Sequence, residues 1–242
     1  TLEQVQQNLQ TAQDLDRAMG ALRQSIANQD QVKSESKYLN EDPTVKANYD
    51  QAVQRAEDII NATQNPELNK GTIEQATQAV QNAEQALHGV EKLNQDKTTA
   101  SKELNNLTNL TDAQREKLKE LINHSDSRDD IKQELEQAKQ LNNAMEQLKN
   151  QVALKDSVHS SSNYFNEDSA QKQAYDDAIK HAEDIIKNTN NPNINPQDII
   201  KALNNIKTAT DNLHGEQRLQ NEKDTSNNSI DHMTHLNQPQ KD

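Results

Sequence analysis

The chain repeats itself with a fixed offset of 126 residues over its length of 242. Aligning the first 116 residues with the last 116, without a gap, gives 41 identities. This period is longer than the roughly 20–50 residues of a simple solenoid repeat, so the chain reads as nearly two copies of one tandem unit. The recurring motifs are YLNED at 38–42 and YFNED at 164–168, AEDII at 56–60 and 182–186, and LHG at 87–89 and 213–215.

Apolar residues in each copy recur at steps of three and four, which is the period of one face of an α-helix. The pattern predicts an all-α protein. The first stripe consists of Val5, Leu9, Ala12, Leu15, Met19, Leu22 and Ile26, and its counterpart consists of Ile131, Leu135, Ala138, Leu141, Met145, Leu148 and Val152.

Capping residues predict where the helices begin. Thr1 and Ser127 stand at N-cap positions before the two copies of the first helix. A second helix is expected after Asp42, with Pro43 at its first position, and it should end before the Asn-Pro pair at 65–66. A third is expected near Asn69. In the second copy, the Asn-Pro pair at 191–192 marks the end of the second helix, and Pro196 marks the start of the third.

The third stripe continues in phase beyond Gly89 through Leu93 and Leu104. A Gly after Leu-His ordinarily indicates the end of a helix. Because no Pro, Asn-Gly or polar loop cluster follows Gly89, one continuous helix of about 35 residues is favoured instead, roughly 50 Å long. A shorter helix should follow, opened by a capping box of Thr111 and Gln114.

These elements predict two kinds of three-helix bundle in each unit, joined by shared long helices into an elongated rod. The larger bundle should use about 10–34, 42–64 and 70–90, and the smaller should use about 92–107, 111–124 and 127–140. The predicted domains are 1–91, 92–140, 141–217 and the start of a truncated module at 218–242.

Composition supports thin bundles and excludes several functions. The formal net charge is −13, aromatic residues make up 2% of the chain, and there is no Cys. The absence of Cys excludes disulfides and Cys-ligated metals. The acidic balance disfavours binding to nucleic-acid phosphates. No apolar run approaches the ~18 residues of a membrane span, so no membrane insertion by this segment is expected. With no nucleophile motif and no glycine-rich loop, no enzyme and no cofactor are expected.

The residues that suggest a site have simpler interpretations. His232 and His235, with Asp231 beside them, could suggest a metal site, since residues three apart on a helix share a face. The first copy carries Asn at the equivalent positions of the two His, so a surface role is expected and no metal site. His88 and His214 recur beside a glycine and are assigned a packing or hinge role at a module junction.

Two further sets of recurring residues are assigned structural roles. The acidic pairs Glu57-Asp58 and Glu183-Asp184 are expected on a solvated helix face. The four tyrosines are expected to anchor the core, and the acidic end of each YLNED-type motif is expected to cap the second helix. The tyrosines are Tyr38, Tyr49, Tyr164 and Tyr175, and the capping residues are Asn40, Glu41, Asp42, Asn166, Glu167 and Asp168.

The larger bundle resembles a FIVAR module, most clearly in the stretch YLNEDPTVKANYDQAVQRAEDIINAT. The smaller one, LNNLTNLTDAQREKLKELINHSDSRDDIKQELEQA, resembles a GA module of the albumin-binding type. Their alternation over essentially the whole chain is similar to the repeat region of giant matrix-binding surface proteins of staphylococci.

This resemblance implies an extracellular segment on a Gram-positive cell surface that contributes to adhesion to a host matrix protein such as fibronectin. The Ala-rich, interrupted stripes favour intramolecular bundles over a coiled-coil oligomer, so a monomer is expected. The alternative is a passive stalk or envelope spacer with no ligand. Albumin binding is not expected, because the second helix of the GA-like module carries no aromatic residue and offers chiefly Arg115, with Arg128 beyond it. The sequence assigns no ligand-binding residue.

Overall fold

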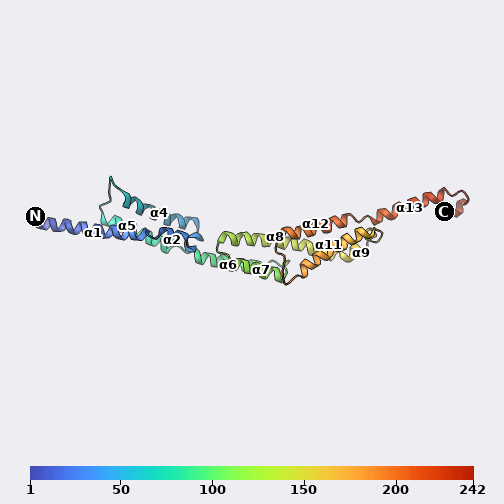
Figure 1. Ribbon diagram of the computed structural model, residues 1–242, viewed down its shortest axis with the longest axis horizontal. Coiled ribbons are helices and arrows are strands. Elements are labelled where there is room, and N and C mark those ends of the chain that lie inside the picture. The colour runs from blue at the N-terminus through green and yellow to red at the C-terminus, as the bar shows by residue number, and fades with distance from the viewer. The chain divides into compact units, whose positions relative to one another are not determined.

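The computed structural model describes residues 1–242 and contains helices but no β-strand (Figure 1), which confirms the all-α class. None of the helices combines the length and the apolar character that crossing a membrane requires. The helices are α1 (Leu2–Ile26), α2 (Gln29–Ser34), α3 (Ser36–Leu39), α4 (Pro43–Asn61), α5 (Lys70–Gln85), α6 (Gly89–Asn105), α7 (Asp112–Asn123), α8 (Arg128–Ala153), α9 (Lys155–His159), α10 (Ser162–Phe165), α11 (Ser169–Lys187), α12 (Pro196–Asp211), α13 (Gly215–Asp231) and α14 (Gln238–Lys241).

The chain forms two compact units. Unit 1 comprises residues 1–100 and 124–131, and unit 2 comprises residues 101–123 and 132–242. The divisions fall inside α6 and inside α8, so each of these helices contributes residues to both units. The long helix α8 confirms one of the expected shared helices. The rod and the domain boundaries expected from the sequence stay predictions.

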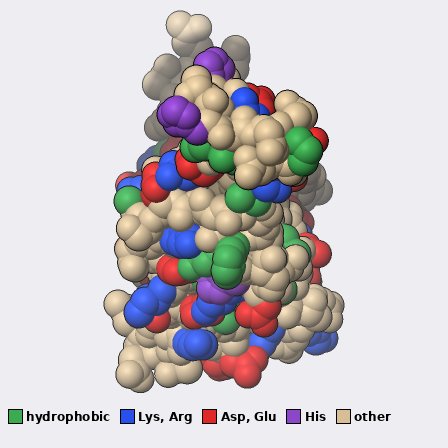
Figure 2. All heavy atoms as spheres, turned by 90° about the vertical axis from the view of Figure 1, so that its right-hand side faces the viewer, with side chains coloured by type: hydrophobic (Ala, Val, Ile, Leu, Met, Phe, Trp, Pro, Cys, Tyr) green, Lys and Arg blue, Asp and Glu red, His purple; other side chains and the backbone are tan.

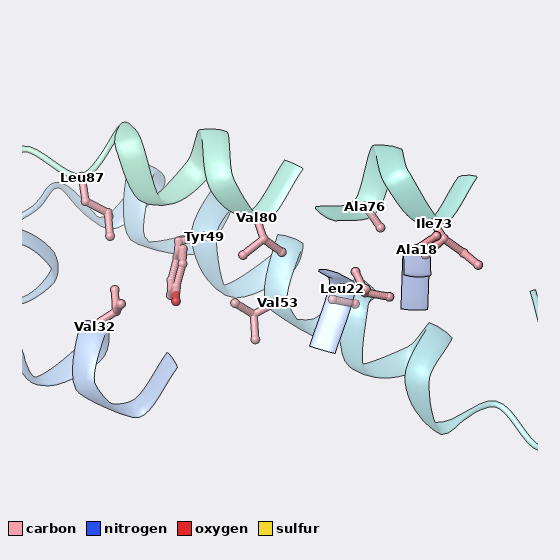
Figure 3. Packing of buried hydrophobic residues seen from close by; sticks show 10 residues of the cluster. Ala18, Leu22, Val32, Tyr49, Val53, Ile73, Ala76, Val80 and Leu87 are labelled. Carbon is pink, nitrogen blue, oxygen red and sulfur yellow. The ribbon is translucent and has the colours of Figure 1, made fainter. Parts of the chain in front are cut away.

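Unit 1 is built on α1, α4 and α5, each of which packs against the other two. Figure 3 shows their apolar side chains pointing toward one another, with Tyr49 and Val53 of α4 facing Val80 of α5. Leu22 and Ile73 are fully buried in the same core. Each such side chain contributes about 1.5–3 kcal/mol by leaving water, which lets a chain poor in aromatic residues hold a thin bundle together.

Most of the predicted helix starts are confirmed. Thr1 and Gln4 form a capping box, and the side chain of Asn69 accepts a hydrogen bond from the backbone of Thr72. Pro43 and Pro196 occupy first-turn positions, where their missing N–H has no intrahelical partner to lose.

The first helix is shorter than expected. It ends at Ile26 rather than near residue 34, and α2 follows after a turn at 27–28. At about 100° per residue, a straight helix would point Val32 some 80° away from Leu22. The turn reorients the chain, so that Val32 is only 1% exposed and joins the core of unit 1.

The expected continuous helix through Gly89 is wrong. Helix α5 ends at Gln85, and α6 begins at Gly89. The interruption has a tertiary cause: the backbone N–H of His88 donates to the carboxylate of Glu41 rather than continuing the ladder of α5. Helix α13 likewise begins at Gly215, after the end of α12 at Asp211.

Unit 2 contains a second FIVAR-like core and most of the smaller bundle. Helix α11 packs against α12, with Tyr175 and Ile199 fully buried. Leu118 of α7 and Leu141 and Leu148 of α8 are buried as well. The predicted capping box of α7 is confirmed: Gln114 N donates to Thr111 Oγ1 and Thr111 N donates to Gln114 Oε1.

Candidate functional sites on the repeated modules

A buried carboxylate joins the YLNED segment to the LHG segment in unit 1. Glu41 is 4% exposed, and its Oε2 accepts a hydrogen bond from the backbone N–H of His88 at 2.6 Å. Its Oε1 accepts from the backbone N–H of Asp42 at 2.8 Å and lies 2.6 Å from the ammonium of Lys92. Glu41 thus accepts the backbone N–H of His88, just before α6, and forms an ion pair with Lys92 on the first turn of that helix.

The expected capping role of the acidic motif needs correction. Asp42 stands at the N-cap position of α4, but its side chain makes no capping hydrogen bond. It pairs instead with Lys92 and, at 2.9 Å, with Arg128. Asn40, which is also buried, accepts a hydrogen bond from the backbone N–H of Arg128 at 3.0 Å. The motif therefore fixes the segments that begin α6 and α8 rather than capping α4.

The contacts of Glu41 recur in unit 2. Glu167 is 8% exposed and accepts hydrogen bonds from the backbone N–H groups of Asp168 and His214. Arg218 stands where unit 1 has Lys92 and forms ion pairs with Glu167 and Asp168. The junction is thus a property of the repeat and not of one copy.

Gly89 and Gly215 leave no room for a side chain, because the backbone of α3 or α10 passes close to their Cα atoms. A Cβ atom added to Gly89 would lie 2.4 Å from the carbonyl oxygen of Ser36 and 2.6 Å from that of Lys37. At Gly215 it would lie 2.5 Å from the carbonyl oxygens of Ser162 and Asn163. The expected junction role of the LHG motif is therefore carried by its glycine and by the backbone of its histidine, whose side chain is exposed in both copies.

The junction electrostatics favour the ionised carboxylates. Burial raises the pKa of Glu41, but the hydrogen bonds from Lys92, Asp42 and His88 outweigh it and hold that pKa below its ordinary value of 4.5. The backbone N–H groups of Asp168 and His214 lower the pKa of Glu167 in the same way. The cations Lys92 and Arg128 lower the pKa of Asp42.

The tyrosines divide into two kinds. Tyr49 and Tyr175 are at most 1% exposed, which confirms their expected role as core anchors, and burial raises the pKa of each to about 12. Tyr38 and Tyr164 are only partly buried, and their hydroxyls donate to Asp50 and Asp176. Each of these outer tyrosines packs edge-on against its buried neighbour.

One exposed apolar position also recurs. Phe165, the single Phe of the chain, is 74% exposed, and its counterpart Leu39 is 56% exposed. The ammonium of Lys172 lies 5.9 Å from the ring centroid of Phe165 and 5.7 Å from that of Tyr164. Each copy therefore presents an apolar side chain next to a tyrosine at the end of a short helix, α3 or α10.

The face drawn in Figure 2 carries no large apolar patch. Its apolar side chains form small separate groups among charged and polar ones.

The other candidates from the sequence are not brought together. Asp231 ends α13, and His232 and His235 lie beyond it, so the two histidines do not share a helix face. Glu57 accepts a hydrogen bond from Gln29, and the neighbouring Asp58 accepts one from Gln54. In the second copy, Glu183 pairs with Lys155 and Asp184 pairs with Lys180.

Sequence reasoning missed two features of the repeat. It did not pair Glu41 with His88. The available signal was that both residues recur 126 positions later, so that the two pairs have the same spacing of 47 residues. It also passed over the equivalence of Leu39 and Phe165, whose only signal is an apolar residue inside an otherwise polar recurring motif.

Comparison with known families and proteins agrees with the two kinds of module. The model of the FIVAR domain family matches residues 18–88 and 144–214, and that of the GA module matches residues 90–144 and 216–242. The chain is 42% identical over 237 residues to the extracellular matrix-binding protein ebh of Staphylococcus aureus strain NCTC 8325 and to EbhA of strain Newman. These matches cover 98% of the chain but only 2% and 7% of those proteins.

Solved structures agree as well. The crystal structure of the 756–1003 domain of EbhA from Staphylococcus aureus superimposes with a TM-score of 0.81 and 31% identity, covering 92% of this chain and 89% of that one. A structure from the study of Embp-mediated adherence of Staphylococcus epidermidis to fibronectin has a TM-score of 0.50 and 41% identity, covering 51% of this chain and 98% of that one.

These relatives are named for extracellular matrix binding, and the chain resembles a repeat segment of them. The two FIVAR matches together span more than half of the chain. The chain therefore belongs to the FIVAR domain family, with its FIVAR domains alternating with GA modules.

Proposed function

We propose that this chain is an adhesive repeat segment of a bacterial surface protein and that its ligand is the host matrix protein fibronectin. The observation that carries the proposal is the 41% identity to the Embp fragment, whose study concerns adherence to fibronectin. About half of this chain aligns with nearly the whole of that fragment, 98% of which is covered.

The surface of the modules supports weak single contacts that add up by repetition. The exposed apolar position of Leu39 and Phe165 recurs once in each copy. Linking two weak sites raises avidity through the effective concentration of the second site, with no new contact. Aromatic side chains, Phe included, are enriched in protein interfaces, so we place the fibronectin contact at Phe165 and, in the first copy, at the equivalent exposed position of Leu39.

Albumin is not the proposed ligand of the GA module. Arg115 donates to the backbone carbonyls of Leu104 and Leu107, and Arg128 pairs with Asp42 and Asp96. The two arginines that stood out in the sequence as contacts are thus engaged inside the modules.

The second candidate is a stalk without a ligand. It is favoured by the polar surface, on which large exposed apolar residues are scattered over many helices and include a single aromatic.

Capture of plasma fibronectin and serum albumin on beads that carry the whole chain tests both candidates. Adhesion predicts saturable capture of fibronectin and none of albumin. If fibronectin is not captured at micromolar concentration, the adhesive candidate is excluded and the stalk without a ligand remains. The same beads loaded with a chain in which Phe165 and Leu39 are both changed to Ala serve as the matched control.

A further inference from the structure

A carboxylate on the second long helix of each FIVAR domain has a different basic partner in the two copies. In unit 1, the ammonium of Lys33 on α2 lies 3.3 Å from Oδ1 of Asp50 on α4. At the equivalent positions of unit 2, Nε2 of His159 on α9 lies 2.7 Å from Oδ1 of Asp176 on α11. The carboxylate thus keeps its place in the repeat, while its partner changes from an amine to an imidazole.

The two pairs are covered to nearly the same extent. The side chains of Lys33 and Asp50 are 36% and 42% exposed, and those of His159 and Asp176 are 33% and 38% exposed. The difference between the copies therefore lies in the chemistry of the partner and not in what surrounds the pair. A lysine ammonium keeps its charge up to about pH 10, whereas an imidazole changes its charge between about pH 5 and 8.

His159 lies in a cluster of aromatic and charged groups. From α10, the ring of Tyr164 has its centroid 4.5 Å from that of His159, and from α11 the centroid of Tyr175 lies 5.9 Å away. Burial raises the pKa of Tyr164 and raises that of Tyr175 to about 12, so both phenols keep their protons at neutral pH. The charged groups of the cluster are Asp176 and Lys172 of α11, the latter over the Tyr164 ring, and, along α9, Asp156 and Lys155, which pairs with Glu183. Among these groups, the imidazole is of the type whose charge changes near neutral pH.

The pair connects the segment of α9 and α10 to the long helix α11. Helix α10 packs against α9 on one side and against α13, the first helix of the next GA module, on the other. The carbonyl oxygens of Ser162 and Asn163 on α10 lie against Gly215, and the last residue of α10 is the exposed Phe165. Whatever fixes α9 to α11 therefore also fixes the backbone that supports the junction between the two modules.

We propose that His159 and Asp176 form a pH-sensitive latch that holds α9 and α10 on α11 more firmly in mildly acidic than in neutral solution. In acid, the imidazolium forms an ion pair and a charge-assisted hydrogen bond with the carboxylate of Asp176. As the pH rises, the ring loses its proton to solvent, and only a hydrogen bond from a neutral ring remains. In unit 1, Lys33 keeps the equivalent pair charged, so the latch belongs to the second copy alone. It acts on the fold whether or not a matrix ligand is bound.

Hydrogen–deuterium exchange of the whole chain at pH 5.5 and 7.5 tests the latch, with each amide's rate divided by its intrinsic rate at that pH. Protection of residues 155–166 should fall about threefold from the lower to the higher pH, as expected when a partly exposed ion pair is lost. Residues 29–40 of the same molecule are the internal reference and should show no such fall. Equal changes in the two segments, or no change in residues 155–166, would overturn the proposal.

Variants that exchange residues between the copies sharpen the test. His159→Lys should keep residues 155–166 equally protected at both pH values, and Lys33→His should transfer the pH response to residues 29–40. His159→Gln keeps a hydrogen-bond donor without a titrating charge, so protection should be low and independent of pH. His181→Arg is the control, since it also installs the first-copy residue at a histidine of unit 2, and it should leave the response of residues 155–166 unchanged. A pH response that survives in the His159→Lys chain would contradict the assignment.

Discussion

The carboxylate of Glu41 accepts a hydrogen bond from the backbone N–H of His88 at 2.6 Å, across 47 residues of sequence. Glu167 and His214 form the same bond across the same separation. The bond ends α5 before α6 begins, and it places Lys92 on the first turn of α6 against the same carboxylate. A recurring tertiary hydrogen bond therefore sets the boundary between the FIVAR domain and the GA module.

The junction predicts a specific acid response. Because the pKa of Glu41 and that of Glu167 are lowered in the folded state, their stabilisation is fully present above about pH 4.5 and is lost as the pH falls through the folded pKa. Changing both to Gln removes the charged acceptors, at a cost of about 1.5–3 kcal/mol for each hydrogen bond to a charged group. The double variant should be less stable than the unchanged chain at pH 7, and its free energy of unfolding should fall less as the pH is lowered.

Urea unfolding of the chain and the double variant, at pH values from 7 to 3, measures this response. Glu116→Gln is the control, since its carboxylate is largely exposed and pairs only with Lys119 among the ion pairs of the chain. A parallel loss of stability in the chain and the double variant would show that the junction carboxylates are not the groups that titrate.

The glycines predict opposite effects of one substitution. Gly89→Ala should destabilise unit 1 by about 1–3 kcal/mol, the usual cost of overpacking, because the new methyl group meets backbone oxygens. Gly20→Ala, on α1, has nothing within 4 Å of the new Cβ and should stabilise by about 1 kcal/mol through helix propensity. Thermal unfolding of the two variants checks the signs. Stabilisation by Gly89→Ala would contradict the close approach.

Removing the hydroxyl group of Tyr49 and removing that of Tyr38, two rings in contact, should have opposite effects on the free energy of unfolding. The hydroxyl of Tyr49 is buried and has no hydrogen-bond partner in the protein, so Tyr49→Phe should leave stability unchanged or raise it by up to about 1 kcal/mol. Tyr38→Phe removes a hydrogen bond to Asp50 and should lower stability by about 1 kcal/mol. The free energies of urea unfolding decide the order, and a Tyr49→Phe variant less stable than Tyr38→Phe would refute it.

Phe165 predicts an effect on binding without an effect on folding. The side chain is 74% exposed, so Phe165→Ala should leave the unfolding midpoint unchanged. If the ring is a contact, its loss should weaken fibronectin binding about tenfold, which corresponds to about 1.4 kcal/mol. Leu154→Ala, at an exposed apolar position outside the motif, should have no effect on binding. Equal losses from the two variants would exclude Phe165 as a specific contact.

The helical fold was predictable because its signals are local. The stripes on α4 and α5, the N-cap of Asn69 and the capping box of Thr111 depend on residues within about four positions, and the structure confirms each of them. The family resemblance was predictable for a different reason, since the period and the order of the modules are properties of the whole chain.

The errors arose where a distant residue competes with a local pattern. The stripe through Gly89 stays in phase, so periodicity alone predicts a continuous helix, but Glu41 captures the N–H that precedes Gly89. The same competition explains Asp42, whose carboxylate pairs with Lys92 and Arg128 instead of capping α4. Gln114 was predicted only as a cap, and its further bond to Asn193 depends on the packing of α7 against a loop 79 residues away.

The adhesive role is tested most directly by the equilibrium binding of the intact chain to immobilised plasma fibronectin, followed by surface plasmon resonance. An adhesive segment should give a saturable response with a dissociation constant on the order of micromolar, weakened by Phe165→Ala, and no response on albumin. A folded chain that gives no saturable response to fibronectin at concentrations well above micromolar would contradict the adhesive role.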